Sequence, residues 1–364
     1  MTTSLAAVAV EPGKTELREL PVPDPTPGSA WLRVDVTGVC GSDPTLYRRV
    51  VGPTIMGHEI VGRVDRLTPE AAERWDLVEG DQVMLEEYLP CGHCDWCRSG
   101  DFRLCDSTDL HLGRASILRY GMTPVAVDPG LWGGYSQYLF LHPRMVFHRL
   151  PAGLAPRCAP LALPLANGFE WVVREGGVRP GQSVVVIGPG QQGLACLVAA
   201  KEAGAGMVIS VGLGRDVQRL GMARRLGADR IVDAEAESVL EAVEEATGGR
   251  MADLVVDVAA GTAATINQGL AALRKRGMLV CAVGRSMVEV DMTLVRTRAV
   301  TVRGLRGHSY AAVEWALSYL ASGRRPYAEL SAGTVSLSHV DDALRRTAEG
   351  DVMHISVDPW SEMP

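Results

Sequence analysis

The sequence predicts an α/β protein that combines a mainly-β domain with a doubly wound parallel sheet. Three observations lead to this prediction. From Gly181 onward, short β-branched strands alternate with helical segments, which is typical of a parallel sheet flanked by helices. A glycine-rich turn separates the first strand and helix of that series. Before it, residues 5–36 alternate apolar and polar side chains with the period of two that half-buried strands show.

Composition and charge limit the class of partner. The chain has 364 residues, enough for two domains, and a net charge of −7 without a Lys/Arg block, so nucleic acid and anionic membrane surfaces are not expected as its main partners. No apolar run reaches membrane-spanning length, and Met1–Val10 lacks the regions of a signal peptide. We therefore expect a cytoplasmic protein whose eight cysteines are thiols or metal ligands.

The N-terminal part contains two separated candidate metal ligands. Trp31–Val36 reads as a strand with period two, and Cys40 follows its end. His58 stands just before the next apolar strand, so both side chains are expected at the ends of neighbouring β elements. Each residue alone is also compatible with a buried thiol or a hydrogen-bonded core imidazole.

Four cysteines at the spacing C-x2-C-x2-C-x7-C predict a metal-binding lobe at residues 90–106. Such short spacings suit a loop that wraps around one tetrahedral zinc ion. Four thiolates leave no open position for a substrate, so a structural role is predicted. The alternatives are four unconnected thiols and an iron–sulfur cluster. The four residues are Cys91, Cys94, Cys97 and Cys105.

The glycine-rich turn predicts a dinucleotide site. The run Val184–Ile187 is apolar and β-branched, as in a strand buried on both faces. Gly188 allows a tight turn, Gly190 lets the backbone approach a pyrophosphate, and Gly193 lets the next helix pack closely on the strand. The amides at the helix start would then face the phosphates. A purely structural turn is the alternative.

The remaining units extend the sheet and lead back to the first domain. Strands are expected at 207–211, 230–232, 254–258, 278–283 and 299–303, and helices at 165–175, 194–203, 216–226, 238–247 and 262–273. A helix at 310–320 and a final strand at 354–357 are expected to rejoin the first domain. We predict a catalytic domain at 1–155, a dinucleotide-binding domain at 156–295 and a return to the catalytic domain at 296–364.

Nearly the whole chain resembles the zinc-containing medium-chain dehydrogenase family, which includes alcohol, polyol and threonine dehydrogenases. The resemblance rests on Gly38-Val-Cys-Gly-Ser-Asp43, Gly57-His-Glu59, the four-cysteine lobe, Gly188-Pro-Gly-Gln-Gln-Gly193 and Val283-Gly284. It implies a GroES-like catalytic domain beside a Rossmann domain, a small alcohol or carbonyl substrate, and a homodimer or homotetramer.

The resemblance also implies roles for single residues. Cys40 and His58 would bind a catalytic zinc, Glu59 would be a neighbouring or alternate ligand, and Ser42 would relay the alcohol proton to solvent. The four cysteines of the lobe would hold a structural zinc. The cofactor contacts would be Gly188, Gly190, Gln191, Gln192, Gly193, Gly212, Arg215, Val283 and Gly284.

Three positions depart from the family pattern. Leu163 stands where relatives carry a Glu, Asp or Cys ligand, so the zinc is held by Cys40, His58 and Glu59 with water, or the site is weak or empty. The second strand of the Rossmann domain ends on Gly212 instead of an acid, and Arg215 follows, which favours NADP over NAD. Thr45 replaces a histidine of the proton relay.

The leading hypothesis is a zinc-dependent NAD(P) alcohol dehydrogenase or carbonyl reductase for a secondary or bulky alcohol. One alternative is a related NADPH reductase of C=C bonds or quinones without the catalytic zinc. A non-catalytic nucleotide-binding protein is the other. Leu46, Tyr47, the 106–132 loop and Asn167 are expected to line the substrate cleft, and His354 is a candidate phosphate contact.

Overall fold

The computed structural model describes residues 2–109, 118–259, 264–284 and 287–361. It divides into two compact units. Unit 1 contains Met1–Ala162, Leu317–Ser322 and Ala328–Pro364, and unit 2 contains Leu163–Ala316 and Gly323–Tyr327. The predicted domain limits at 155 and 295 therefore fall earlier in the chain than the changes between compact units, and as limits of functional domains they stay predictions.

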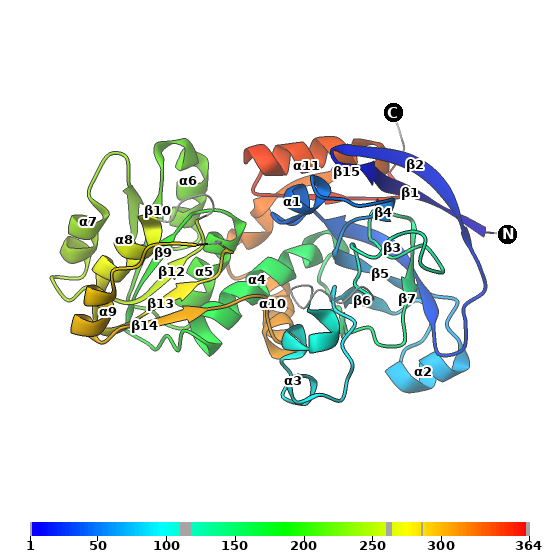
Figure 1. The fold of residues 1–364 in the computed structure, drawn as a ribbon, viewed down its shortest axis with the longest axis horizontal. Coiled ribbons are helices and arrows are strands. Elements are labelled where there is room, and N and C mark those ends of the chain that lie inside the picture. Colours follow the sequence, from blue (N-terminus) through cyan, green and yellow to red (C-terminus); the bar gives the residue numbers. More distant parts are fainter. Residues whose placement is uncertain (1, 110–117, 260–263, 285–286, 362–364) are drawn as a thin grey trace. The chain divides into compact units, whose positions relative to one another are not determined.

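Unit 1 is built mainly from antiparallel strands (Figure 1). Its strands are β1 (Thr2–Glu11), β2 (Lys14–Val22), β3 (Ala30–Gly38), β4 (Thr54–Ile55), β5 (Glu59–Asp65), β6 (Gln82–Leu85), β7 (Tyr138–Leu141), β8 (Phe147–Arg149), β15 (Ser331–Val335) and β16 (His354–Val357). They form a three-stranded sheet in the order β2-β1-β4 and a seven-stranded sheet in the order β15-β16-β3-β5-β6-β8, with β7 on β3.

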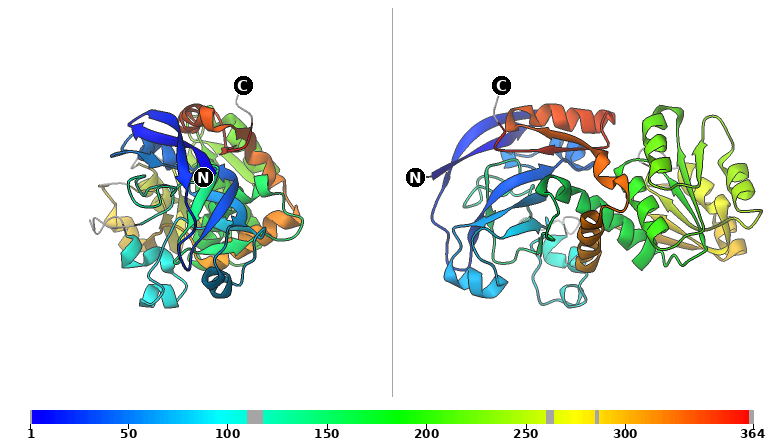
Figure 2. Two further views of the ribbon diagram at one scale, coloured as in Figure 1. Left: turned by 90° about the vertical axis from the view of Figure 1, so that its right-hand side faces the viewer. Right: turned by 180° about the vertical axis from the view of Figure 1, so that it is seen from behind.

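Short helices connect these strands. They are α1 (Asp43–Tyr47), α2 (Pro69–Trp75), α3 (Asp95–Arg98), α11 (Val340–Glu349) and the short 3-10 helices η1 (Phe102–Leu104), η2 (Asp106–Thr108), η4 (Pro156–Leu161), η7 (Pro326–Leu330) and η8 (Leu337–His339). The view from behind in Figure 2 shows α11 beside the β1–β2 ribbon, which it contacts through β2.

The pairing of β3 with β5 sets up the first predicted site. Trp31, Leu32 and Val34 on β3 are buried in the core of unit 1, which fixes the face that the strand turns inward. The two strands are antiparallel, and Gly38 at the end of β3 stands opposite Glu59 at the start of β5. The chain leaving β3 and the chain entering β5 therefore lie at the same end of the sheet, as the sequence predicted.

Unit 2 is a doubly wound parallel sheet. Its strands are β9 (Ser183–Ile187), β10 (Met207–Gly212), β11 (Arg230–Asp233), β12 (Ala252–Asp257), β13 (Leu273–Cys281) and β14 (Thr301–Gly304), and they run in the order β11-β10-β9-β12-β13-β14. All five pairings are parallel. This is the order expected for a dinucleotide-binding sheet, with the strand order reversing between β9 and β12.

Helices cover both faces of that sheet (Figure 2). They are α5 (Gln191–Glu202), η6 (Gly214–Asp216), α6 (Val217–Arg225), α7 (Val239–Ala246), α8 (Ala264–Ala272) and α9 (Met292–Arg298). α10 (Tyr310–Ser322) lies where the helix at 310–320 was predicted, and its residues are divided between unit 2 (to Ala316) and unit 1 (from Leu317). The helix predicted at 165–175 is instead α4 (Ala162–Gly168) followed by a π-helical turn, η5 (Phe169–Arg174).

Burial explains why β9 reads as a continuous apolar run. Every residue of β9 is buried, since both neighbours in the sheet and helices on both faces surround it. Within the described part of the chain, no helix has the length and apolar composition needed to cross a bilayer.

Candidate functional site

The four cysteines of the 90–106 lobe converge in unit 1. Their sulfur atoms all lie within 4.8 Å of one another, and none belongs to a disulfide. The sulfur atoms of Cys94 and Cys97 are 3.5 Å apart, and those of Cys91 and Cys97 are 3.9 Å apart. A tetrahedral zinc with Zn–S bonds of about 2.3 Å needs sulfur atoms roughly 3.8 Å apart. The lobe therefore has the dimensions of a closed four-thiolate site.

Backbone amides of the lobe already point at sulfur. The amides of Cys94 and Cys91 donate to the sulfur atoms of Cys91 and Cys105, each over 3.4 Å. Burial raises the pKa of Cys105, but hydrogen bonds from the Cys91 amide and from Ser107 outweigh it and hold the pKa at about 6. The thiolate that binds zinc is thereby favoured at this position.

A second pair of predicted ligands, Cys40 and His58, meets at the adjoining ends of β3 and β5. Asp43 contacts both the Cys40 amide and the His58 ring, and burial and Glu59 raise the pKa of the Cys40 thiol while the nearby imidazole lowers it in part. Ser42 is exposed, and its hydroxyl donates to Cys40 Sγ over 3.4 Å. His58 Nδ1 lies 3.1 Å from Asp43 Oδ1. Metal-binding histidines are commonly oriented by a carboxylate at one ring nitrogen, which leaves the other for the metal.

Asp43, which the sequence analysis did not single out, organises this corner. It is 1% exposed, and its Oδ2 accepts hydrogen bonds from the Cys40 amide (3.0 Å) and the Tyr135 hydroxyl (2.9 Å). Burial lowers the pKa of His58, but the carboxylates of Asp43 and Glu87 outweigh that effect, and the pKa stands well above its usual value. The corner thus concentrates negative charge that a bound cation would offset.

Glu59, the third predicted ligand, is held by a histidine of the C-terminal strand. Its Oε2 lies 3.3 Å from Nε2 of His354, and both side chains are almost fully buried. A Cβ atom on Gly38 would stand 2.1 Å from that oxygen and 2.8 Å from the His354 nitrogen, so only glycine leaves room for the pair. His354, proposed from sequence as a phosphate contact, instead pairs with Glu59 inside unit 1.

The three candidate ligands are therefore not equivalent. Among the described residues, the four cysteines of the lobe are the one set of three or more Cys, His, Asp or Glu ligand atoms that lie within 4.8 Å of one another. Cys40 and His58 come together, and Glu59 is next to His58 in the chain but is engaged by His354. Leu163 is buried and offers no ligand atom.

An ion pair that the sequence did not reveal packs beside His58. Nη2 of Arg119 lies 2.5 Å from Oε1 of Glu87, and the guanidinium stacks on Tyr88 with its carbon 4.4 Å from the ring centre. The chain then passes close to the Cys40–His58 corner, since a Cβ on Gly121 would lie 3.2 Å from His58 Cβ. Arg119 and Gly121 belong to the predicted 106–132 loop, whose His111 and Arg114 lie outside the described residues.

Two other residues expected at the substrate cleft are engaged within their own units. The Tyr47 hydroxyl donates to Asp341 Oδ1 on α11 over 2.5 Å, inside unit 1. Asn167 on α4 bonds to Gln192 and to His308, inside unit 2. A role for either residue toward substrate stays a prediction.

The glycine-rich turn has the geometry that a dinucleotide needs. Gly188 has φ +101°, a conformation that favours glycine. A Cβ on Gly193 would stand 1.8 Å from the carbonyl oxygen of Gly188, so α5 approaches β9 as closely as predicted. A Cβ on Gly190, the residue directly before α5, would meet nothing within 4 Å. The turn therefore fits a pyrophosphate beside the first amides of α5.

The end of the second strand explains the missing acid. A Cβ on Gly212 would lie 2.8 Å from Cγ of Pro189, so the proline of the glycine-rich turn excludes any larger residue there. Arg215 is exposed, and no described residue forms a hydrogen bond or ion pair with it. Nearby Asp216 accepts from the Leu213 amide and pairs with Arg219. Val283 and Gly284 follow the end of β13 at the same edge of the sheet.

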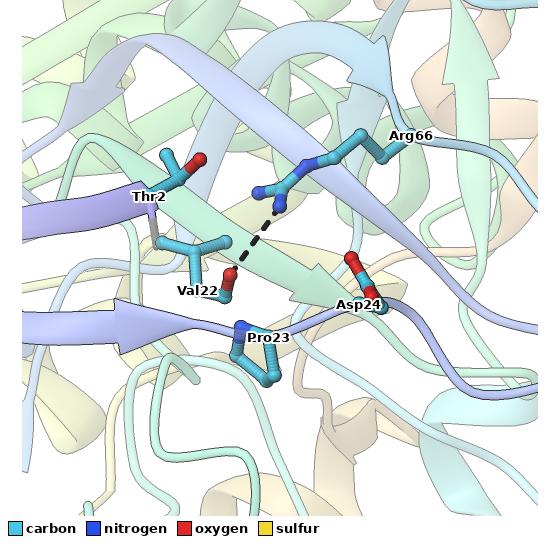
Figure 3. Close-up of a pocket in the computed structure, with 5 residues that line it drawn as sticks. All are labelled: Thr2, Val22, Pro23, Asp24 and Arg66. Carbon is cyan, nitrogen blue, oxygen red and sulfur yellow. Dashed lines mark hydrogen bonds between the residues drawn. The ribbon is translucent and has the colours of Figure 1, made fainter.

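A surface pocket of about 660 Å³ lies elsewhere in unit 1 (Figure 3). Thr2, Val22, Pro23, Asp24 and Arg66 line it, and Arg66 Nη1 donates to the Val22 carbonyl over 3.3 Å. None of the predicted site residues is among them, and we assign no role to this pocket.

Comparisons with known proteins agree with both units. The family model for the alcohol dehydrogenase GroES-like domain matches residues 26–152, and that for the zinc-binding dehydrogenase domain matches residues 193–322. The chain is 37% identical to a probable alcohol dehydrogenase of Mycobacterium tuberculosis, with 94% of each chain covered. It is 31% identical to a sorbitol dehydrogenase of Halalkalibacterium halodurans, covering 93% of this chain and 94% of that one. The solved alcohol dehydrogenase of Thermus sp. ATN1 superposes with a TM-score of 0.84 at 26% identity, covering 97% of this chain and 99% of that chain.

Proposed function

Because the chain belongs to the zinc-containing medium-chain dehydrogenase family and is an oxidoreductase of the alcohol dehydrogenase type, we propose that it interconverts an alcohol and its carbonyl compound at the Cys40–His58 corner, with NADP preferred over NAD. The observation that carries the proposal is the convergence of Cys40, His58 and Ser42 around buried Asp43. If the His58–Asp43 pair were only structural, it would not require the exposed Ser42 hydroxyl that bonds to the Cys40 thiol. The substrate is expected to be a secondary or bulky alcohol.

Each residue of the corner has a defined part. Cys40 and His58 are donors for a metal, and Asp43 fixes the histidine ring through Nδ1. A bound zinc would supply a Lewis acid for the alcohol oxygen, and a bound nicotinamide ring the hydride acceptor. Ser42, which is exposed and touches Cys40, can pass the alcohol proton to solvent. With Thr45 in place of a histidine, the relay ends at Ser42 in this proposal.

Glu59 is the further ligand that this proposal requires. With Leu163 unable to coordinate, a thiolate, a carboxylate and a neutral imidazole would leave the site near neutrality with one open position. Oε2 of Glu59 is paired with His354, so a metal would take either Oε1 or an Oε2 released from that pair. We expect Glu59→Ala to lose the catalytic zinc and turnover and to keep the structural zinc, and Leu163→Glu to bind zinc at least as tightly as the native protein.

The matched control for Glu59→Ala is Glu86→Ala. Glu86 Oε1 lies 3.3 Å from His148 Nε2, and both are almost fully buried, so this variant breaks a Glu–His pair of the same geometry. It is expected to lower stability and to keep two zinc ions per chain. The measurement is zinc per chain with turnover on a panel of alcohols and carbonyl compounds. Two zinc ions and native turnover in Glu59→Ala would rule out Glu59 as a required ligand.

The same measurement addresses the second candidate function, an NADPH reductase of C=C bonds or quinones without the catalytic zinc. Leu163 and the Glu59–His354 pair favour it. One zinc per native chain and reduction of enones or quinones would support that reading. Failure to turn over any substrate while binding the nucleotide would support a non-catalytic binding protein.

The cofactor preference has its own test. Arg215 is an exposed cation near the start of α6, and Gly212 leaves no acid to bind ribose hydroxyls. A charge-assisted hydrogen bond contributes about 1.5–3 kcal/mol, roughly 10- to 100-fold in affinity. Arg215→Ala should weaken NADPH binding by that factor and NADH binding little, as measured by fluorescence titration. Arg219→Ala, which removes a cation already paired with Asp216, is the matched control. Equal losses of affinity for both cofactors in Arg215→Ala would remove the argument for NADP.

A cytoplasmic homodimer or homotetramer completes the proposal.

A further inference from the structure

Three consecutive residues after β14 are tied to the α4–η5 segment. The Trp171 indole donates to the Gly307 carbonyl over 2.9 Å. His308 Nδ1 lies 2.8 Å from Asn167 Oδ1. The Ser309 amide and hydroxyl both donate to Oε2 of Glu170, over 3.1 and 2.6 Å. Since each residue of 307–309 has its own bond to this segment, the chain beyond β14 has little freedom to move independently of it.

The other side of α4 is tied to the glycine-rich turn. Asn167 Nδ2 donates to Gln192 Oε1 over 3.2 Å, and Gln192 lies in the first turn of α5, next to Gly193. The backbones also touch, since a Cβ on Gly168 would stand 2.4 Å from the carbonyl oxygen of Ala195. Asn167 therefore bonds on one side to the predicted phosphate site and on the other to His308.

The donors and acceptors run in one direction. The oxygen of the Asn167 amide accepts, so His308 carries its proton on Nδ1, and the nitrogen of the same amide donates to Gln192. His308 is 6% exposed and Asn167 is half-buried, which shields both bonds from competing water. The three side chains form one hydrogen-bond relay, from His308 through Asn167 to Gln192.

The strand order indicates which parts of a bound dinucleotide the two ends of this relay would lie near. In a sheet of this order a dinucleotide crosses the carboxyl edge with its pyrophosphate at the switch point, and its two halves lie over the two halves of the sheet. Gln192 stands at the crossing, and His308 follows the end of β14, in the half of the sheet formed by β12, β13 and β14. The relay thus spans from the pyrophosphate to the half that does not hold the adenosine.

We propose that the Gln192–Asn167–His308 relay positions the nicotinamide half of the cofactor by holding the 307–309 segment in register with the phosphate turn. The inference rests on the proposed function, since it takes a nicotinamide dinucleotide as the ligand. These residues act by positioning, and no chemical step is assigned to them.

The test separates the two halves of the cofactor. NADPH and 2′-phospho-ADP-ribose share every group except the nicotinamide ring, so their affinities are compared by titration, together with the fluorescence of bound NADPH. His308→Ala should weaken NADPH about five- to tenfold, the effect of one lost hydrogen bond, and leave 2′-phospho-ADP-ribose unchanged. His308→Gln, whose amide can donate to Asn167, should recover most of the loss.

Thr247→Ala is the matched control. It removes a buried hydroxyl bond to the Val243 carbonyl in the same unit and outside the 307–309 segment, so it should lower thermal stability and leave the ratio of the two affinities as in the native protein. Asn167→Ala interrupts the relay at a half-buried side chain and should give the same ratio of the two affinities as His308→Ala. It therefore tests the relay even if His308→Ala folds poorly.

Two results would overturn the proposal in distinguishable ways. An unchanged ratio of affinities in both His308→Ala and Asn167→Ala would show that the relay only stabilises unit 2, and the proposed function would stand. A native protein that binds neither ligand would refute the proposed cofactor, and the relay with it.

Discussion

Replacing Gly193 by alanine tests the close approach of α5 to β9. The new Cβ would lie 1.8 Å from the Gly188 carbonyl oxygen, a backbone atom that cannot rotate away. Overpacking of this kind costs about 1–3 kcal/mol, more than the gain of up to ~1 kcal/mol from replacing glycine inside a helix. For a unit of this size the melting temperature should fall by roughly 2–12 °C. Differential scanning calorimetry without cofactor measures it.

Gly190→Ala is the matched variant with the opposite expectation. Its Cβ meets nothing within 4 Å, and its backbone at φ −70° and ψ −175° suits any residue, so stability without cofactor should stay as in the native protein. The added methyl occupies the side by which a pyrophosphate would approach, so the rise in melting temperature on adding saturating NADPH should shrink. This account of the turn would be refuted if Gly193→Ala kept the native melting temperature. It would also be refuted if the melting temperature of Gly190→Ala rose on adding NADPH as much as that of the native protein.

Two further outcomes are expected in unit 1. Cys97→Ser should lose one zinc ion per chain and lower the melting temperature, whereas Cys158→Ser, outside the lobe, should keep both; equal metal content in the two variants would contradict the structural site. His142 is held neutral, since burial lowers its pKa to about 4 and its Nδ1 accepts from the Arg144 amide. Unfolded, it has a pKa of about 6.5, so stability should decline as the pH falls from ~6.5 toward 4. His142→Gln should flatten that decline in melting curves recorded at several pH values, and an unchanged slope would show that another group causes it.

Local patterns predicted the parts of the molecule whose chemistry is local. The glycine-rich turn and the alternation after it depend on neighbouring residues, and the sheet has the predicted order. The four cysteines lie within a short stretch, so their spacing indicated their convergence. In each case, the residues that make the contact are close in the sequence.

Contacts between distant segments left no such pattern. His354 bonds to Glu59, 295 residues away in the sequence, and His308 bonds to Asn167, 141 residues away. Tyr135 supports Asp43 through a hydroxyl that no periodicity predicts. The clash between Pro189 and any side chain at 212 likewise appears only when β10 lies beside the turn. Such residues read as ordinary core or loop positions until tertiary structure brings their polar atoms together.

Magnitudes decide whether Glu59 can replace the ligand missing at Leu163. Moving Oε2 of Glu59 from His354 to a metal would leave a buried imidazole unpaired, since no described residue bonds to its Nδ1 either. An unpaired buried polar group costs about 1–3 kcal/mol. Zinc binding to protein sites yields apparent free energies of about 10–16 kcal/mol for four structural ligands, several kcal/mol per ligand. The exchange is therefore favourable by a narrow margin, and His354→Ala, which removes the competing partner, should tighten the catalytic zinc relative to the native protein.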